Sequence, residues 1–143
     1  MGSLSVRLSR NPIRPLTVIY SRERLSRNLT PEEIFKLHPK LRWAAYSVDG
    51  KVLFCQMRPG VESYTSDEDD RAFMQFGPLI ISGVGERLTH SGGAGKLQSV
   101  LVNMEKDSVL LMKFRDGFLA LSVNRNEAFG VFQEIDARLR ELA

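Results

Sequence analysis

The chain has 143 residues, of which 43% are hydrophobic and 26% charged, values typical of one globular domain rather than a disordered or fibrous protein. Its apolar runs, such as residues 77–84, are too short to span a membrane, and the N-terminal region lacks the apolar segment of a secretory signal. We therefore expect a cytoplasmic protein, and its single cysteine, Cys55, excludes an internal disulfide and a thiolate zinc site.

The net charge of +3 is unevenly distributed along the chain. Residues 1–30 contain six arginines and one glutamate, a net charge of +5, so residues 31–143 carry −2. Residues 1–28 are predicted to form a basic leader that is flexible or extended. Its candidate contact residues are Arg7, Arg10, Arg14, Arg22, Arg24 and Arg27. Such a leader attracts nucleic acid or anionic lipid, and the alternatives are a solvated tail and a docking strand.

The first clear elements are a short helix and a hairpin. Residues 30–33, Thr-Pro-Glu-Glu, form a capping box with proline at the first helical position, and the helix should end before Pro39. Two β-like runs follow, residues 41–47 and 51–57, joined by Asp49-Gly50. Because this dipeptide readily adopts positive φ, the pattern predicts a β-hairpin.

A long helix is predicted next, from about residue 67 to residue 88. Ser66 and the acidic run 67–70 suit a helix start, since carboxylates near the N-terminal amides are favoured by the helix dipole. Pro78 lies in the middle of this helix and removes one amide donor. We expect either a kink over residues 71–77 or a new helix that starts at Pro78.

The remainder predicts a three-stranded meander and a final helix. The strands are residues 97–104, 108–115 and 118–123, with a turn at Asp116-Gly117 between the last two. Asn126 is the expected helix cap. The apolar positions of this helix are Phe129, Phe132, Ile135 and Leu139.

The order helix-β-β-helix-β-β-β-helix predicts one α+β domain over residues 29–143, with a five-stranded antiparallel sheet covered by helices. This order resembles the roadblock/dynein-light-chain proteins, within the profilin-like and longin-like sandwiches, over about residues 30–142. The resemblance implies a homodimer or heterodimer that serves as a platform for small GTPases or for motor and signalling complexes.

Short segments also resemble an uncharacterised archaeal family of small cytosolic proteins. They are residues 38–42 (His-Pro-Lys-Leu-Arg), 48–51 (Val-Asp-Gly-Lys), 57–61 (Met-Arg-Pro-Gly-Val), 95–97 (Gly-Lys-Leu) and 104–106 (Met-Glu-Lys). That family has no assigned activity, so the resemblance implies an archaeal-type cytosolic domain and no particular chemistry.

The central helix is the candidate dimer interface, because it is apolar on more than one side. The residues assigned to this interface are Phe73, Met74, Gly77, Ile81, Val84 and Leu88. Two further residues are candidates for contact with a partner or an anion. Arg58 lies in an Arg-Pro-Gly loop, where it either faces a partner or holds the loop by pairing with Glu62 or the acidic helix start. Lys96 follows a glycine-rich turn.

No catalytic, cofactor-binding or metal-binding residues are predicted. Residues 91–97, Ser-Gly-Gly-Ala-Gly-Lys-Leu, depart from a phosphate loop in the placement of glycine and in the residue after lysine. The chain is therefore predicted to be a non-enzymatic dimeric interaction or scaffold module with a protein partner. The alternatives are a nucleic-acid-associated protein that uses the leader and a small-molecule sensor with Trp43 in the wall of a pocket.

Overall fold

A computed structural model describes residues 29–90, 93 and 95–143. The chain divides into two units at residue 30, and the fold below is that of the second unit. The predicted division into residues 1–28 and 29–143 stays a prediction. The elements are α2 (Pro31–Phe35), β1 (Trp43–Val48), β2 (Lys51–Met57), α3 (Asp67–His90), β3 (Ser99–Asn103), β4 (Asp107–Phe114), β5 (Gly117–Asn124), the 3₁₀ helix η1 (Arg125–Glu127) and α4 (Ala128–Leu142). No helix among the described residues is long and apolar enough to cross a membrane.

The five strands form one antiparallel sheet in the order β2-β1-β5-β4-β3, which confirms the predicted α+β class. The hairpin of β1 and β2 turns at Asp49-Gly50, where both residues have positive φ as the sequence predicted. The register of this hairpin shifts between Tyr46 and Ser47, because Leu53 is an extra residue in β2. The sheet therefore has β2 at one edge and β3 at the other.

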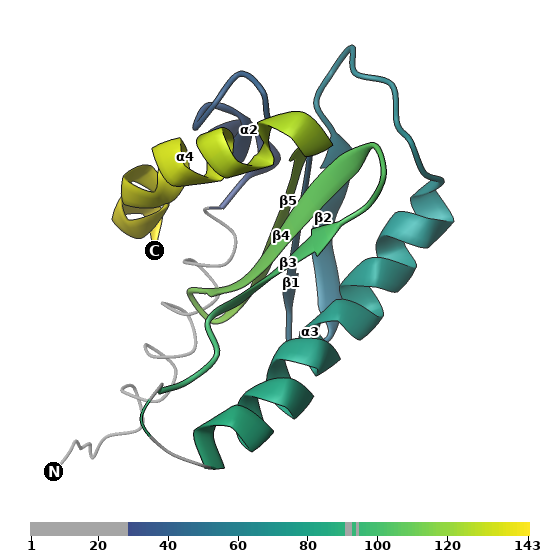
Figure 1. Ribbon diagram of the computed structural model, residues 1–143. Helices are drawn as coiled ribbons and strands as arrows, with labels where there is room; N and C mark the ends of the chain where they lie inside the picture. The colour runs from purple at the N-terminus through teal and green to yellow at the C-terminus, as the bar shows by residue number, and fades with distance from the viewer. Residues whose placement is uncertain (1–28, 91–92, 94) are drawn as a thin grey trace, which may run out of the picture. The chain divides into compact units, whose positions relative to one another are not determined.

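Helices cover both faces of the sheet. Helix α3 crosses one face, while α2 and α4 lie on the other (Figure 1). Side chains alternate between the faces along each strand, so Ala45 and Ala120 point toward α3 and Tyr46 and Leu121 point toward α4. Both faces therefore bury apolar side chains, as a three-layer arrangement requires.

Small residues allow α3 to approach the sheet closely. Ala45, Ala120 and Leu111 are directly paired across β1, β5 and β4, and they form one core cluster with Met74 and Ile81 of α3. All five are at most 2% exposed. The alanines leave room for the larger side chains of the helix, which fixes the position of α3 over this row.

Helix α3 runs continuously through Pro78 to His90, so the predicted alternative of a new helix at Pro78 is wrong. Proline removes only one amide donor from the ladder of hydrogen bonds. The burial of Met74 and Ile81, on either side of Pro78, supplies packing that holds both halves of the helix on the same sheet.

The C-terminal helix differs from its prediction in two details. Asn126 lies inside the 3₁₀ turn η1 and does not cap α4, whose N-cap position is Glu127. The buried side of α4 consists of Ala128, Val131, Ile135 and Leu139. Phe129 is 83% exposed, because it lies about 100° around the helix from Ala128, outside the stripe of buried residues.

The turn between β4 and β5 depends on a close approach of two strands. The turn residues are Arg115 and Asp116, one position earlier than predicted, and Arg115 has positive φ. A Cβ atom at Gly117 would lie 2.1 Å from the carbonyl oxygen of Ser47 and 2.8 Å from Cγ2 of Val48. Any other residue here would push β5 away from β1.

We expect Gly117→Ala to lower the free energy of unfolding by about 1–3 kcal/mol, the usual cost of forcing extra volume into a packed site. Gly130→Ala is the matched control, since a Cβ there would meet nothing within 4 Å. It should raise the free energy of unfolding by up to about 1 kcal/mol through helix propensity. Urea denaturation of the two variants and the wild type measures both effects, and equal stabilities would contradict the packing argument.

Candidate functional site

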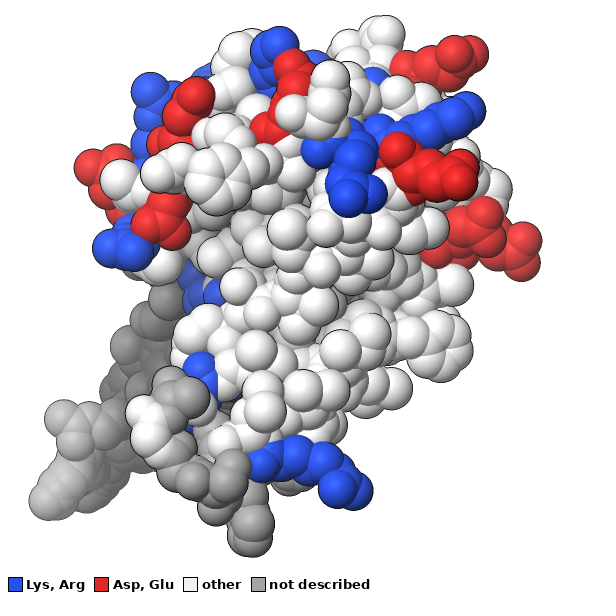
Figure 2. All heavy atoms as spheres, in the orientation of Figure 1, with Lys and Arg blue, Asp and Glu red and all other residues white. Residues whose placement is uncertain are grey.

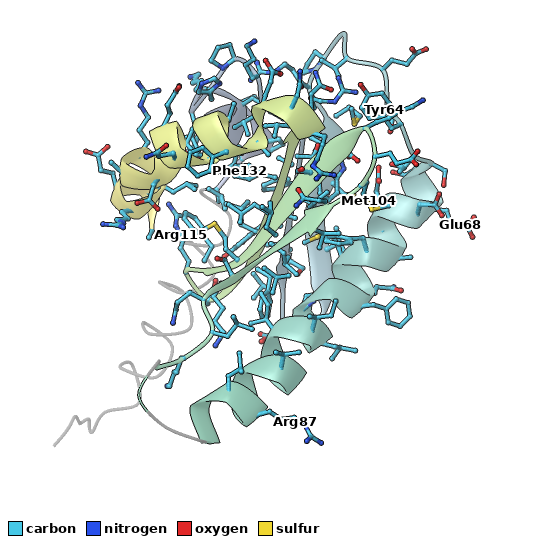
Figure 3. All side chains as sticks on the ribbon, in the orientation of Figure 1. Tyr64, Glu68, Arg87, Met104, Arg115 and Phe132 are labelled. Atoms are coloured by element: carbon cyan, nitrogen blue, oxygen red, sulfur yellow. The ribbon has the colours of Figure 1, made fainter. Side chains whose placement is uncertain are left out.

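The outer side of α3 is an apolar surface without charge. No charged residue occurs between Arg71 and Glu86. The exposed large side chains are Phe76 (64%), Leu79 (64%), Ile80 (46%), Val84 (46%) and Leu88 (51%). Figure 2 shows uncharged atoms over the middle of this face, from the acidic start of α3 to a basic side chain near its other end, which Figure 3 identifies as Arg87. We call these five residues the outer α3 face.

The sheet edge at β3 is the second exposed feature. Strand β3 pairs with β4, and no other strand among the described residues pairs with its outer side. Leu101 in this strand is 48% exposed, and Met104 just after it is 53% exposed. An unpaired edge with exposed apolar side chains offers backbone donors and acceptors to another strand.

The structure places the residues that the sequence assigned to a dimer interface on two different sides of α3. Val84 and Leu88 are exposed on the outer α3 face. Met74, Gly77 and Ile81 are buried, and Phe73 is half-buried against the same core, so these four face the domain's own sheet. A helix that is apolar on both sides gives no sequence signal for which side is turned inward. The dimer interface itself stays a prediction, and the exposed neighbours of Val84 and Leu88 on this helix are Phe76, Leu79 and Ile80.

Arg58 is held by backbone carbonyl groups. Its Nε donates to the carbonyl oxygen of Leu41 at 2.6 Å, and one Nη donates to those of Phe35 and His38 at 2.7 and 2.6 Å. The guanidinium also lies 5.1 Å from the centroid of the Phe35 ring. These bonds satisfy carbonyl groups at and beyond the end of α2, so Arg58 joins α2 to the strand that follows. Its contact with a partner stays a prediction.

The structure gives less information on the other predicted contact residues, Lys96 and the leader arginines. Lys96 is exposed and lines an open hollow of about 520 Å³ together with Lys113 and Ser82. The six leader arginines lie outside the described residues, so the nucleic-acid alternative stays a prediction. Among the described residues, no group of three or more His, Cys, Asp or Glu is arranged to hold a metal ion.

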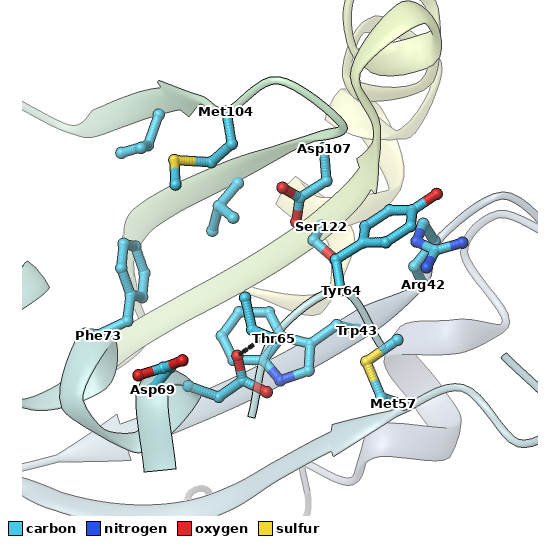
Figure 4. Close-up of a pocket in the computed structure, with 13 residues that line it drawn as sticks. Arg42, Trp43, Met57, Tyr64, Thr65, Asp69, Phe73, Met104, Asp107 and Ser122 are labelled. Carbon is cyan, nitrogen blue, oxygen red and sulfur yellow. Dashed lines mark hydrogen bonds between the residues drawn. The ribbon is translucent and has the colours of Figure 1, made fainter. Parts of the chain in front are cut away.

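A pocket of about 270 Å³ lies between the start of α3 and the sheet (Figure 4). Its floor is one transverse row of paired residues across all five strands. The row consists of Met57, Trp43, Ser122, Val109 and Val102. Phe73 of α3 and Met104 after β3 add further apolar walls. The alternative in which Trp43 lines a cavity therefore has a cavity in the predicted place.

Polar groups surround the mouth of this pocket. Three carboxylates, Asp69, Asp70 and Asp107, and one guanidinium, Arg42, line it. Arg42 donates to the carbonyl oxygen of Glu62 at 2.6 Å and lies 4.2 Å from the ring centroid of Tyr64. The lining therefore carries two more negative charges than positive charges.

Burial changes the acidity of two groups, Asp70 in the lining of the pocket and Cys55 in β2. Burial, followed by the nearby carboxylates of Asp67, Asp69 and Asp107, raises the pKa of Asp70, while a hydrogen bond from Thr65 opposes the rise. Burial also raises the pKa of the Cys55 thiol. A thiol with a raised pKa is a poor nucleophile, which favours a packing role for this cysteine.

The acidic part of the pocket was missed by sequence reasoning, although one signal was present. Asp107 occurs at the start of β4 in alternation with Val109 and Leu111, two residues of the buried face. An aspartate in phase with core residues points toward the core side of a sheet. The run 67–70 was interpreted only as a helix start, a role that the Ser66 side chain supports by accepting a hydrogen bond from the Asp69 amide at 3.1 Å.

Solved structures with a similar arrangement of helices and strands identify the type of fold. The chain is similar to a roadblock/LC7 domain from Streptomyces avermitilis, at 14% identity and a TM-score of 0.54, over 73% of this chain and 83% of that one. This is a roadblock-like fold. The chain is also similar to the gliding protein MglB from Thermus thermophilus, at 15% identity and a TM-score of 0.59, over 85% of this chain and 86% of that one.

A further similar structure is described as MglB with a tetrameric arrangement, at 15% identity and a TM-score of 0.56, over 82% of this chain and 83% of that one. At these identities the likeness concerns the roadblock-like fold alone. No protein-family model and no curated protein matches the sequence. The resemblance of short segments to archaeal proteins stays a prediction.

We expect Asp70→Asn to be more stable than the wild type at neutral pH. The pKa of Asp70 is higher in the folded chain than its ordinary value of 3.8, so the folded state loses stability as pH rises through that raised pKa. Asparagine keeps the shape and removes this penalty. The advantage of the variant should shrink as pH is lowered through the raised pKa, which urea denaturation at a series of pH values measures.

The control for this comparison is Glu68→Gln, which changes an exposed carboxylate on the same helical turn. Its difference from the wild type should not follow the pH trend of Asp70→Asn. An Asp70→Asn variant that is less stable than the wild type at neutral pH would contradict the assignment of an unfavourable buried charge.

Proposed function

We propose that this protein is a non-enzymatic, dimeric interaction module of the cytoplasm, in which two copies associate through the outer α3 face and the β3 edge. The observation that supports this most is the outer α3 face itself. Its five large apolar side chains are each between 46% and 64% exposed. A contiguous apolar surface of this kind is costly in water and marks a surface that another protein covers.

A second copy fits this surface for reasons of charge and symmetry. The stretch 72–85 carries no charge, so two copies of the helix meet without repulsion between like charges. A two-fold dimer requires a surface that is complementary to itself. Apolar side chains on a helix satisfy that requirement, since they have no donor or acceptor that must find an opposite group.

The β3 edge adds a directional contact to the same assembly. Two identical edge strands related by a two-fold axis run antiparallel to each other, which allows them to form a regular ladder of hydrogen bonds. The C-terminal half of α3 lies beside the segment that enters β3, because a Cβ at Gly85 would be 3.3 Å from Cβ of Leu97. We therefore propose that the apolar face and the open edge act together in one interface.

The further partner that we propose is a protein, with a small GTPase or a signalling protein as the class. This part of the proposal rests on the roadblock-like fold. The tetrameric arrangement described for one MglB structure shows that a protein with this fold can assemble with itself. Under this proposal the dimer is the unit that a partner recognises, and the chain contributes a surface rather than a reaction.

We expect Phe76→Glu to convert a wild-type dimer into folded monomers. Placing a carboxylate in the centre of an apolar interface should raise the dissociation constant by at least about 100-fold, as expected for a central aromatic residue. Light scattering after size-exclusion chromatography measures the mass, and circular dichroism checks that the monomer is folded.

The matched control is Phe129→Glu, which changes an equally large and even more exposed phenylalanine on α4. This variant should remain a dimer, because Phe129 lies on the opposite side of the sheet from α3. A wild-type monomer at high protein concentration would overturn the proposal. Loss of the dimer in both variants would move the interface away from α3.

A further inference from the structure

The two ends of α3 carry charges of opposite sign. The start of the helix, residues 67–71, holds four acidic residues and one basic residue, a net charge of −3. Near the other end, Arg87 is exposed, and Lys96 and Lys113 line the hollow beside the C-terminal half of the helix. The only acidic residue in this part of the helix is Glu86, so these four residues have a net charge of +2. The uncharged middle of α3 thus separates a negative end from a positive end.

One charge at each end lies on the same line along the helix. Asp69 and Arg87 are 18 residues apart, which is five complete turns at 3.6 residues per turn. Phe76 of the outer α3 face lies between them, within about 20° of the same direction. The proline in the helix does not disturb this phase, because Met74 and Ile81, on either side of it, are both buried against the sheet. The outer α3 face therefore has a carboxylate at one end and a guanidinium at the other.

Both of these charged side chains are available to another chain. Arg87 is exposed, and Asp69 is exposed at the mouth of the pocket. Neither forms an ion pair within the part of the chain that the structure describes. The basic residue nearest to Asp69 in the helix, Arg71, pairs instead with Asp67, at 3.0 Å. A second copy of the helix can therefore supply the opposite charge to each.

The spacing of the two charges is symmetric about the uncharged stretch. Residue 78 is midway between Asp69 and Arg87, and the centre of the stretch 72–85 lies between residues 78 and 79. Two β3 edges can pair with both helices on the same side of the joined sheet only if the two-fold axis is perpendicular to the sheet. Such an axis makes the two α3 helices antiparallel. Asp69 of one copy then lies opposite Arg87 of the other, and the contact occurs twice.

The dimensions of packed helices allow these side chains to meet. Each charged residue is about 14 Å along the helix from its centre, at a rise of about 1.5 Å per residue. For helix axes about 9 Å apart that cross at about 20°, the separation at this point is still only about 10 Å. An arginine and an aspartate on facing sides of such helices form a charge-assisted hydrogen bond across that separation.

The opposite orientation of the two helices is disfavoured by the same charges. In a parallel pair, two helix starts with a net charge of −3 each would lie side by side. Like charges placed together destabilise an interface and so exclude the wrong arrangement. Apolar side chains in the middle of the helix have no donor or acceptor that distinguishes the two orientations. The choice is therefore made by the charged ends.

We propose that the charged ends of α3 select a second copy of this chain and fix its orientation, with Asp69 of each copy paired to Arg87 of the other. Lys96 and Lys113 add positive potential beside the acidic helix start of the other copy. Apolar contacts supply most of the affinity, and the two charge pairs supply the selectivity. This inference rests on the proposed dimer and names the residues that determine its partner.

The first test is the dissociation constant of the full-length dimer, measured by analytical ultracentrifugation, for Asp69→Arg and for Arg87→Glu. Each reversal places like charges together at both ends of the helix pair. We expect the dissociation constant to rise about tenfold or more at about 0.01 M salt. At about 1 M salt, where the screening length is about 3 Å, the rise should shrink to about threefold or less.

The second test is rescue. The double variant Asp69→Arg, Arg87→Glu exchanges the two charges and should return the dissociation constant to within about threefold of the wild-type value. An equal mixture of the two single variants should form mixed dimers in preference to either homodimer, since both charge pairs are complementary only in the mixed dimer. Neither result follows if the substitutions merely weaken the helix, because the double variant carries both substitutions.

Glu68→Arg is the control for position, since it makes the same charge change on an exposed neighbour of Asp69, about 100° around the helix (Figure 3). Combined with Arg87→Glu, it should not restore the dimer. Equal rescue by Glu68→Arg, or a dimer that keeps its affinity in both single reversals, would overturn the charge pairing. The apolar interface would then still stand on the result for Phe76→Glu, whereas a wild-type monomer would overturn both proposals.

Discussion

The packing of α3 on a row of small residues determines much of this structure. A helix can lie close to a sheet only where the side chains between them are short, and here Ala45 and Ala120 provide that place. Met74 and Ile81 fill the space above the alanines and are almost completely buried. The next row along the strands, with Trp43 and Ser122, lines the pocket at the start of the same helix.

The same packing turns the other side of α3, with Phe76, Leu79, Ile80 and Val84, away from the sheet. A helix that covered the sheet and met only water would carry charged residues on its outer side. Instead α3 is uncharged from residue 72 to residue 85, and its charged residues are confined to its two ends. Its composition is therefore that of a helix between two apolar layers. The sheet supplies one of these layers, and the proposed second copy supplies the other.

Local sequence signals predicted the helices and strands well. The features that these signals did not predict depend on tertiary contacts. The Asp49-Gly50 hairpin depends on two residues whose φ preferences are local, and it forms as predicted. Which side of α3 faces inward depends on which of its two apolar stripes meets Leu111 and the alanines. The periodicity of the helix alone does not specify this. Arg58 binds carbonyl groups of Phe35, His38 and Leu41, whose positions exist only in the folded domain.

The two edges of the sheet differ in a way that limits how copies can assemble. Strand β3 has a regular register with β4, whereas the opposite edge strand, β2, contains the extra residue Leu53 and is followed closely by Pro59. A bulge twists an edge strand, and proline lacks the amide donor that a neighbouring strand needs. Strand addition is thus open at one edge and hindered at the other. A chain with two open edges could extend without limit into a fibre, whereas a chain with one open edge reaches a closed assembly after a single pairing.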